Sequence, residues 1–223
     1  MIIAVDGASG TGKSTICKLI AEELDLSYLD TGAIYRSVAL ITKEKKISLH
    51  DEVGLKKICN SLDLRFEFKD GQNHIYIANR DVSEDIRRPD ISMLASKVSA
   101  LPVVRASLLD MQQRFAKESK KKGVIVDGRD ISTVVFPNAD IKIFLTASNE
   151  VRAKRRFDEL KGKGMNVEYK NILAETIQRD KQDSERSLAP LKKAKDAVEL
   201  NTDGLNINQV KEKIKCIINK KVK

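Results

Sequence analysis

Gly7-Ala8-Ser9-Gly10-Thr11-Gly12-Lys13-Ser14 lies between an apolar run, Ile2 to Asp6, and a run with apolar residues at helical spacing, Ile16 to Leu24. It matches G-x-x-x-x-G-K-S, the pattern of a phosphate-binding loop between a strand and a helix. Glycines let the backbone turn its N–H groups toward a polyphosphate, and the helix start adds a positive dipole end. We predict that Lys13 reaches the β- and γ-phosphates and that the Ser14 hydroxyl is a ligand of Mg²⁺.

Composition limits the classes of protein that remain. The chain has 223 residues, 41% of them hydrophobic, enough for one large domain or one domain with an insertion. Aromatic content is 4% with no Trp, which argues against an aromatic surface for single-stranded nucleic acid. The net charge of +9 fits either a nucleic-acid or membrane surface or a lysine-rich exterior around an anion site. Because the lysines are mostly scattered, we expect binding to neither nucleic acid nor membrane.

The cysteines and histidines are few and far apart. Cys17, Cys59 and Cys216 form no C-x-x-C pair, so we expect free thiols in a reducing compartment. No apolar run approaches the ~20 residues of a membrane span, and Met1 leads directly into the first strand without a signal peptide. We therefore expect a cytoplasmic protein. His50 and His74 are the only histidines, so a metal–histidine site or a histidine-based triad is not expected.

Strands and helices alternate along most of the chain. This alternation predicts an α/β fold with a doubly wound, five-stranded parallel sheet of the P-loop NTPase type. The predicted strands are 2–6, 27–29, 123–127, 141–145 and 196–200.

The rhythm changes between about 47 and 100. Residues 64–68 and 74–78 alternate around a predicted turn with Asp70-Gly71, which indicates a β-hairpin. We predict a third short strand at Asp81-Val82. We interpret the segment as an inserted antiparallel β and helical subdomain. Helical patterns also cover 33–41, about 53–62, 93–100, 103–115 and 205 to the C-terminus.

Two predicted helices carry arginines on one face. Arg152, Arg155 and Arg156 share a face of the helix 150–160, and a helix from Tyr169 to beyond Asp183 carries further charged groups. We predict a mobile lid over phosphates at 151–186, with the core formed by 1–46, 101–150 and 187–223. The alternative is a solvated helical hairpin held by charge pairs.

Two polar residues follow predicted strands. Asp127 closes the apolar strand 123–127 and can hold Mg²⁺ directly or through water, or can simply cap a turn. Arg36 lies one helical turn beyond the strand 27–29, where ligands gather in parallel sheets, although an ordinary solvent-facing arginine is the alternative.

Several segments together resemble the bacterial-type cytidylate kinases over essentially the whole chain. The P-loop alone is shared by many families, whereas D-T-G-A-I-Y-R with G-R-D at this spacing is far more specific. The matching stretches are 7–15, 30–36, 128–130, 133–137, 179–180, 183–184, 186 and 189–191. The resemblance implies that the insert at about 47–100 is the subdomain that binds the nucleoside monophosphate.

The resemblance implies ATP- and Mg²⁺-dependent phosphoryl transfer to CMP or dCMP, in pyrimidine nucleotide metabolism. It implies an ATP site at Gly7, Ala8, Ser9, Gly10, Thr11, Gly12, Lys13, Ser14 and Thr15. It implies that Thr31, Ser96, Arg105 and Asp130 surround cytosine, that Arg36, Arg129 and Arg186 hold the acceptor phosphate, and that Arg179 and Asp183 face the ribose. The resemblance also implies that Arg155, together with Arg152 or Arg156, reaches the ATP phosphates from the lid. The implied catalytic residues are Lys13, Arg129, Arg155 and Arg186, and the implied metal residues are Ser14 and Asp127.

The residue chemistry fits a cytosine base. A carboxylate such as Asp130 accepts from the exocyclic amine, and an arginine such as Arg105 donates to the ring acceptors. Uracil has a carbonyl group in place of the amine and a proton on N3. Asp130 would then face an acceptor and Arg105 a donor, and such unpaired buried polar groups disfavour uracil. Two departures from the family pattern are Thr31, where some relatives have Ser, and Ser132, where glycine is expected. Ser132 is strained if that position needs a positive φ.

Other functions remain as alternatives. A P-loop kinase for another small acceptor, such as UMP or an alcohol, keeps the same loop, although an alcohol needs a general base and no carboxylate stands out as one. A GTP-driven switch normally shows N-K-x-D, which is absent. A nucleic-acid-binding module predicts charge clustered on one surface. Without a sustained heptad pattern, we expect a monomer.

Overall fold

The computed structural model describes residues 1–69 and 72–222, and its chain divides into two compact units. The sheet unit combines Met1–Leu29 with Phe115–Lys223, and the second unit is Asp30–Arg114. The predicted boundaries of insert, lid and core stay predictions, and each unit is described by itself below.

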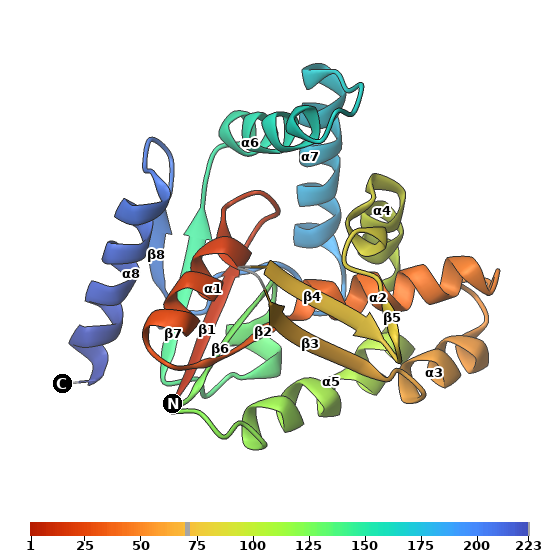
Figure 1. The fold of residues 1–223 in the computed structure, drawn as a ribbon, viewed down its shortest axis with the longest axis horizontal. Helices are drawn as coiled ribbons and strands as arrows, with labels where there is room; N and C mark the ends of the chain where they lie inside the picture. The colour runs from red at the N-terminus through yellow and green to blue at the C-terminus, as the bar shows by residue number, and fades with distance from the viewer. Residues whose placement is uncertain (70–71, 223) are drawn as a thin grey trace. The chain divides into compact units, whose positions relative to one another are not determined.

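The sheet unit is built on five parallel strands in the order β2-β6-β1-β7-β8 (Figure 1). Their bounds are β1 Ile2–Gly7, β2 Ser27–Asp30, β6 Val124–Gly128, β7 Ile141–Thr146 and β8 Val198–Asn201. Ile3 of the central strand β1 lies opposite Ile125 of β6 and Ile141 of β7. The predicted five-stranded parallel sheet is confirmed.

The strand β8 begins later than predicted. Asp196, the predicted first residue, precedes the strand, and its carboxylate lies 2.8 Å from Nζ of Lys142. Asp196 is exposed, and regular pairing with β7 starts at Val198, opposite Ile143.

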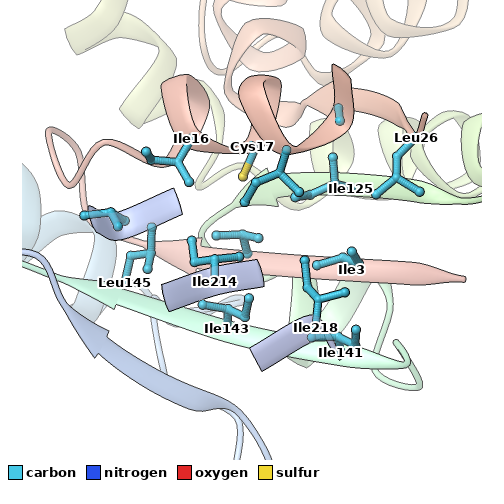
Figure 2. Packing of buried hydrophobic residues seen from close by; sticks show 14 residues of the cluster. Ile3, Ile16, Cys17, Leu26, Ile125, Ile141, Ile143, Leu145, Ile214 and Ile218 are labelled. Atoms are coloured by element: carbon cyan, nitrogen blue, oxygen red, sulfur yellow. The ribbon is translucent and has the colours of Figure 1, made fainter. Parts of the chain in front are cut away.

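Helices α1, Lys13–Glu23, and α8, Ile207–Val222, pack against one face of this sheet. Figure 2 shows Ile16 and Cys17 of α1 in one cluster with Ile214 and Ile218 of α8, and Ile214 lies beside Ile143 of β7. Ile141, Ile143 and Leu145, alternate residues of β7, belong to the same cluster. The alternation follows from the two-residue period of a strand, and the β-branched side chains fill the buried surface.

Two more helices of the sheet unit are α6, Asn149–Gly162, and α7, Tyr169–Glu185. They pack through Ala153, Leu160 and Ile172, and match the predicted helical pair. A π-helical turn, Ile131–Val135, follows β6 and was not predicted.

The second unit contains an antiparallel sheet in the order β3-β4-β5. Leu64 pairs with Ile77, which confirms the predicted hairpin, while its predicted turn at Asp70-Gly71 lies outside the described residues. The elements are α2 Thr31–Glu44, α3 Glu52–Asn60, β3 Leu64–Lys69, β4 Gln72–Ile77, β5 Arg80–Asp81, a 3₁₀ turn Asp85–Arg87, α4 Pro89–Val98 and most of α5 Pro102–Lys117.

Prolines set the starts of two helices in this unit. Pro89 begins α4, four residues before the predicted start at Met93, and Pro102 begins α5. Proline is well suited to the first helical position because a backbone N–H there has no partner within the helix, so proline loses no hydrogen bond by lacking it. Among the described residues no single helix is long and apolar enough to cross a membrane, and only the bent pair α4 and α5, meeting at 97°, passes by length and composition.

Candidate active site

The phosphate loop leaves the end of the central strand β1 and enters α1. A Cβ added to Gly7 would lie 2.3 Å from the carbonyl oxygen of Leu145 in β7, so only glycine fits there. Gly12 has a φ of 91° and precedes the first helical residue, Lys13. The strand, turn and helix predicted for the motif are therefore present.

The outer side of the loop is held by hydrogen bonds to its carbonyl groups. Nη1 of Arg152 donates to Ser9 at 2.9 Å, and Nη1 of Arg155 donates to Gly10 at 3.4 Å. Oγ1 of Thr202 lies 3.4 Å from the carbonyl oxygen of Thr11 and 3.1 Å from that of Thr146. Since a trans peptide directs its C=O and the following N–H oppositely, the next N–H groups point away from these partners. The loop can thus offer several N–H groups to one anion.

Lys13 is buried beside this loop and is 5% exposed. Its Nζ donates to the Ala8 carbonyl at 2.6 Å and to Oγ1 of Thr11 at 3.3 Å. Burial first, and then the positive charge of Arg129, lower the pKa of Lys13 to about 7. An anion bound at the loop would therefore stabilise the charged form of Lys13.

Ser14 and Asp127, the predicted metal residues, are brought together. Oγ of Ser14 donates to Oδ2 of Asp127 at 2.8 Å, and the Tyr28 hydroxyl donates to Oδ1 at 3.0 Å. Among residues 1–69 and 72–222 no group of three or more His, Cys, Asp or Glu could hold a metal. One carboxylate with one hydroxyl nevertheless suits Mg²⁺, which takes its other ligands from water and phosphate.

A carboxylate that the sequence interpretation missed lies directly before the loop. Asp6 is 0% exposed and accepts from the backbone N–H groups of Ile131 at 2.7 Å and Ser132 at 2.8 Å. The Ser132 hydroxyl also donates to Asp6. Burial raises the pKa of Asp6, and the three donors oppose that effect. Ser132 is not among the positive-φ residues, so the strain considered for it does not arise.

Charged side chains directly after β6 and at the C-terminal end of α7 form a largely buried cluster in the sheet unit. Nε of Arg129 donates to Oδ2 of Asp183 at 2.8 Å, and Nη2 of Arg186 lies 3.6 Å from Oδ1 of Asp130. Although burial alone raises the pKa of Asp183, the guanidinium groups led by Arg129 hold it below its usual range. Nη1 of Arg179 lies 3.4 Å from Oγ of Ser9, at the phosphate loop. The structure thus gathers the predicted acceptor-side residues of this unit.

The chain after α7 positions Arg186. Its Nε donates to the Ala189 carbonyl at 2.6 Å, and the N–H of Leu191 donates to the carbonyl of Asp183 at 2.7 Å. Ala189 has a φ of 50°, uncommon for a residue with a side chain. The turn therefore holds a guanidinium with backbone groups at some conformational cost.

The second unit carries the other predicted acceptor residues. Asp30 caps α2 by accepting from the Ala33 N–H at 2.9 Å, and it accepts from Nη2 of Arg36 at 2.9 Å. A Cβ at Gly32 would lie 2.9 Å from Nη1 of Arg36, so the glycine makes room for the guanidinium. Thr31, the first residue of α2, is 3% exposed.

Arg105 lies among polar and aromatic groups of the same unit. Nη1 donates to the Ser99 carbonyl at 3.0 Å, and its guanidinium carbon lies 5.6 Å from the centre of the Tyr35 ring. Oγ of Ser99 donates to the carbonyl of Ser96, at 2.9 Å. Arg105 and the Ser96 segment are therefore neighbours, as the predicted cytosine site requires of them.

The predicted lid arginines have different surroundings. Arg155 contacts the loop and also donates to Oγ1 of Thr202 at 3.1 Å and to its carbonyl at 2.8 Å. Arg156 pairs on the outer side of α6 with Glu159 at 2.8 Å. Arg152 is 3% exposed and bound on all sides by the protein.

A phosphate loop at the end of the central strand of a five-stranded parallel sheet, with arginines that contact the loop, defines the class of P-loop kinases. The fold agrees with a crystal structure of shikimate kinase from Bacteroides thetaiotaomicron, with a TM-score of 0.51, 14% identity and 98% coverage of each chain. The family model described as Cytidylate kinase matches residues 3–220, and the chain belongs to the cytidylate kinase family.

Full-length relatives support the same membership. The chain is 48% identical over 221 residues to a cytidylate kinase of Caldicellulosiruptor bescii, covering 99% of this chain and 96% of that protein. It is 45% identical to a cytidylate kinase of Carboxydothermus hydrogenoformans, covering 99% and 98%. It is 47% identical to cytidylate kinase 1 of Haemophilus influenzae, covering 94% and 90%. The resemblance stated from the motifs is confirmed.

Proposed function

We propose that the protein transfers the γ-phosphoryl group of ATP to CMP or dCMP, giving ADP and CDP or dCDP. The observation that carries the proposal is the buried cluster in which Arg129 pairs with Asp183 and Arg186 lies near Asp130, with Arg179 beside the phosphate loop. Such a cluster suits a phosphate monoester with a polar base and sugar. Membership of the cytidylate kinase family supports the same substrate class.

On the donor side, residues Gly7 to Thr15 bind the ATP phosphates through backbone N–H groups and Lys13. Ser14 and Asp127 hold Mg²⁺, since their side chains already lie together. When bound, the ion supplies positive charge that offsets the charge of the phosphates.

On the acceptor side, we assign guanidinium groups to the phosphate and other polar groups to the sugar and the base. Arg36, Arg129 and Arg186 bind the acceptor phosphate, because guanidinium groups match phosphate oxygens with paired hydrogen bonds. Arg179 and Asp183 bind the ribose. The proposed base-binding residues are Thr31, Ser96, Arg105 and Asp130.

Catalysis in this proposal is electrostatic. The acceptor phosphate has a second pKa of about 6, so the attacking oxygen is mostly ionised at neutral pH and needs no general base. The barrier is repulsion between two anions. Lys13, Arg129, Arg155 and Arg186 lower it by charge and by aligning the groups.

We further propose that the protein acts as a cytoplasmic monomer that binds neither nucleic acid nor membranes. Its lysines are mostly scattered along the sequence, which favours a solvated lysine-rich exterior over one basic face. Sedimentation and a filter-binding titration with DNA and RNA test these points: a dimer, or salt-dependent retention, contradicts them.

ADP formation tests the activity, with ATP and Mg²⁺ and with CMP, dCMP, UMP, AMP, GMP or no acceptor. We expect strong turnover with CMP and dCMP, weak turnover with UMP, and loss of turnover in Lys13→Ala. Omission of Mg²⁺ should also abolish turnover. Turnover only with UMP or a purine contradicts the base-binding roles of Asp130 and Arg105.

A further inference from the structure

Arg152, at the start of α6, uses every hydrogen-bond donor within the protein. A guanidinium has five N–H donors. Nε donates to the Ala147 carbonyl at 3.0 Å, and Nη1 donates to the Ser9 carbonyl and to Oδ1 of Asp180, both at 2.9 Å. Nη2 donates to Oδ1 of Asn149 and to Oδ2 of Asp180. With its donors used in this way, Arg152 is better placed to orient other groups than to bind a phosphate.

The partners of Arg152 come from two parts of the proposed site. Ser9 belongs to the phosphate loop, and a Cβ at Gly10 would lie 3.0 Å from Cβ of Arg152, so the loop packs closely on α6. Asp180 belongs to α7 and is held by both terminal nitrogens of the guanidinium. A bidentate pair fixes orientation as well as distance.

Asp180 is surrounded in sequence by residues that face the substrates in the proposed function. Arg179 precedes it and lies 3.4 Å from Oγ of Ser9. Asp183, almost one helical turn later, pairs with Arg129 at 2.8 Å. A shift of Asp180 therefore moves both Arg179 and Asp183 relative to the loop.

We propose that Arg152 and Asp180 are positioning residues that couple the phosphate loop to α7, so that ATP in the loop strengthens the binding of CMP. The proposal rests on the proposed function, because it assigns the two substrates to the loop and to α7. Coupling between two sites is reciprocal, so CMP strengthens the binding of the ATP analogue by the same factor.

Titration calorimetry tests the coupling. The dissociation constant of CMP is measured without and with a saturating β,γ-imido analogue of ATP and Mg²⁺. In the unchanged protein we expect the ratio of the two constants to exceed about 5, the low end of ordinary coupling between sites. In Asp180→Asn, which has only one carbonyl oxygen for Arg152, we expect the ratio to fall toward 1.

A matched control lies on the same helix. Glu159→Gln removes the carboxylate of an exposed pair with Arg156, and we expect it to leave the ratio unchanged. Thermal unfolding of each variant checks that it folds. If Asp180→Asn does not fold, Arg152→Lys keeps the charge but loses the forked geometry, and the same fall is expected.

The outcomes separate the proposals. A ratio near 1 in the unchanged protein, or an undiminished ratio in the folded variants, overturns the coupling. Absence of CMP binding by the unchanged protein contradicts the proposed function itself.

Discussion

At the scale of single residues, Lys13 has the environment that most constrains its chemistry. Its ammonium is buried, and Arg129 adds a second positive charge, so its pKa falls to about 7. Anionic phosphates reverse the balance by favouring the charged form. The protonation of Lys13 and the binding of nucleotide are therefore linked.

We predict that ATP binding takes up protons above neutral pH. At about pH 8 Lys13 is mostly neutral in the free protein and charged in the complex, so uptake approaches one proton. At about pH 6 Lys13 is already charged, and its uptake vanishes. Calorimetry in two buffers of different ionisation enthalpy measures the uptake.

The control for this prediction is Lys13→Arg, whose guanidinium stays charged throughout. The rise in uptake between the two pH values should be missing from that variant. An unchanged protein with no extra uptake at the higher pH contradicts the link to Lys13.

Asp6 supports a second prediction about a single side chain. Asp6→Asn replaces one acceptor oxygen by a donor, so buried donors of the turn after Asp130 lose their partner. We expect a loss of about 1–3 kcal/mol in unfolding free energy, measured in urea, with a raised KM for CMP. Ser132→Gly removes only the hydroxyl donor and should cost less; an equal or larger cost would show that Asp6 does not organise this turn.

Contacts between side chains that are distant in the sequence could not be predicted from the sequence. The candidate residues Lys13, Asp127 and Asp183 could be named from the phosphate-loop motif, the end of an apolar strand and the family resemblance, respectively. The partners did not: Tyr28 on Asp127 and Ser132 on Asp6 join residues far apart in the chain. No local pattern encodes such a pair, because it depends on which strands become neighbours.

At the scale of elements, Asp30 has two functions at the start of α2. It caps the helix through the Ala33 N–H and pairs with Arg36, a proposed ligand of the acceptor phosphate. The two contacts use different carboxylate oxygens, so substitutions can separate them.

We predict that Asp30→Ala lowers the unfolding free energy by about 1 kcal/mol, the usual value of a helix cap, and raises the KM for CMP. Asp30→Asn keeps a cap and removes the ion pair, so it should affect KM more than stability. Urea unfolding and steady-state kinetics measure the two effects. Equal stability of both variants with the unchanged protein contradicts the capping role.

Elements with strong periodicity were predicted well, and irregular ones were not. The helix pair α6 and α7 and the hairpin of β3 and β4 were located within a few residues. The π-helical turn Ile131–Val135 was missed because its stability comes from Asp6, outside the turn. The predicted strand 196–200 began two residues too early, since Asp196 and Ala197 precede β8.

At the scale of the whole molecule, the protein has a net charge of +9, whereas both nucleotide substrates are anions. Positive charge attracts anionic ligands over a distance set by the salt concentration. The net positive charge is therefore expected to raise the rate at which nucleotides associate with the protein, independently of the contacts within the site.

We predict that kcat/KM for CMP falls severalfold between about 0.01 and 0.15 M salt, where the Debye length shortens from about 30 to 8 Å. Chemistry inside the buried site is screened less, so kcat should change little. Initial rates over this salt series measure both parameters. A constant kcat/KM contradicts attraction over distance.

The class of fold was predictable at this scale because one motif fixes a strand, a turn and a helix, and apolar runs supply the other strands. The strand order β2-β6-β1-β7-β8 comes from the structure alone. The extent of the second unit, Asp30–Arg114, likewise reflects contacts between distant residues.

The central position of β1 has a consequence for the synthesis of the protein. Both neighbours of β1, the strands β6 and β7, lie in the second half of the chain. On the ribosome, the apolar residues Ile2–Val5 must therefore wait for the chain up to Gly128 before any sheet partner emerges. Pairing between such distant segments is slow, and unpaired strands are prone to aggregate. The nascent chain is thus expected to depend on chaperones that shield its first strand until β6 has been synthesised.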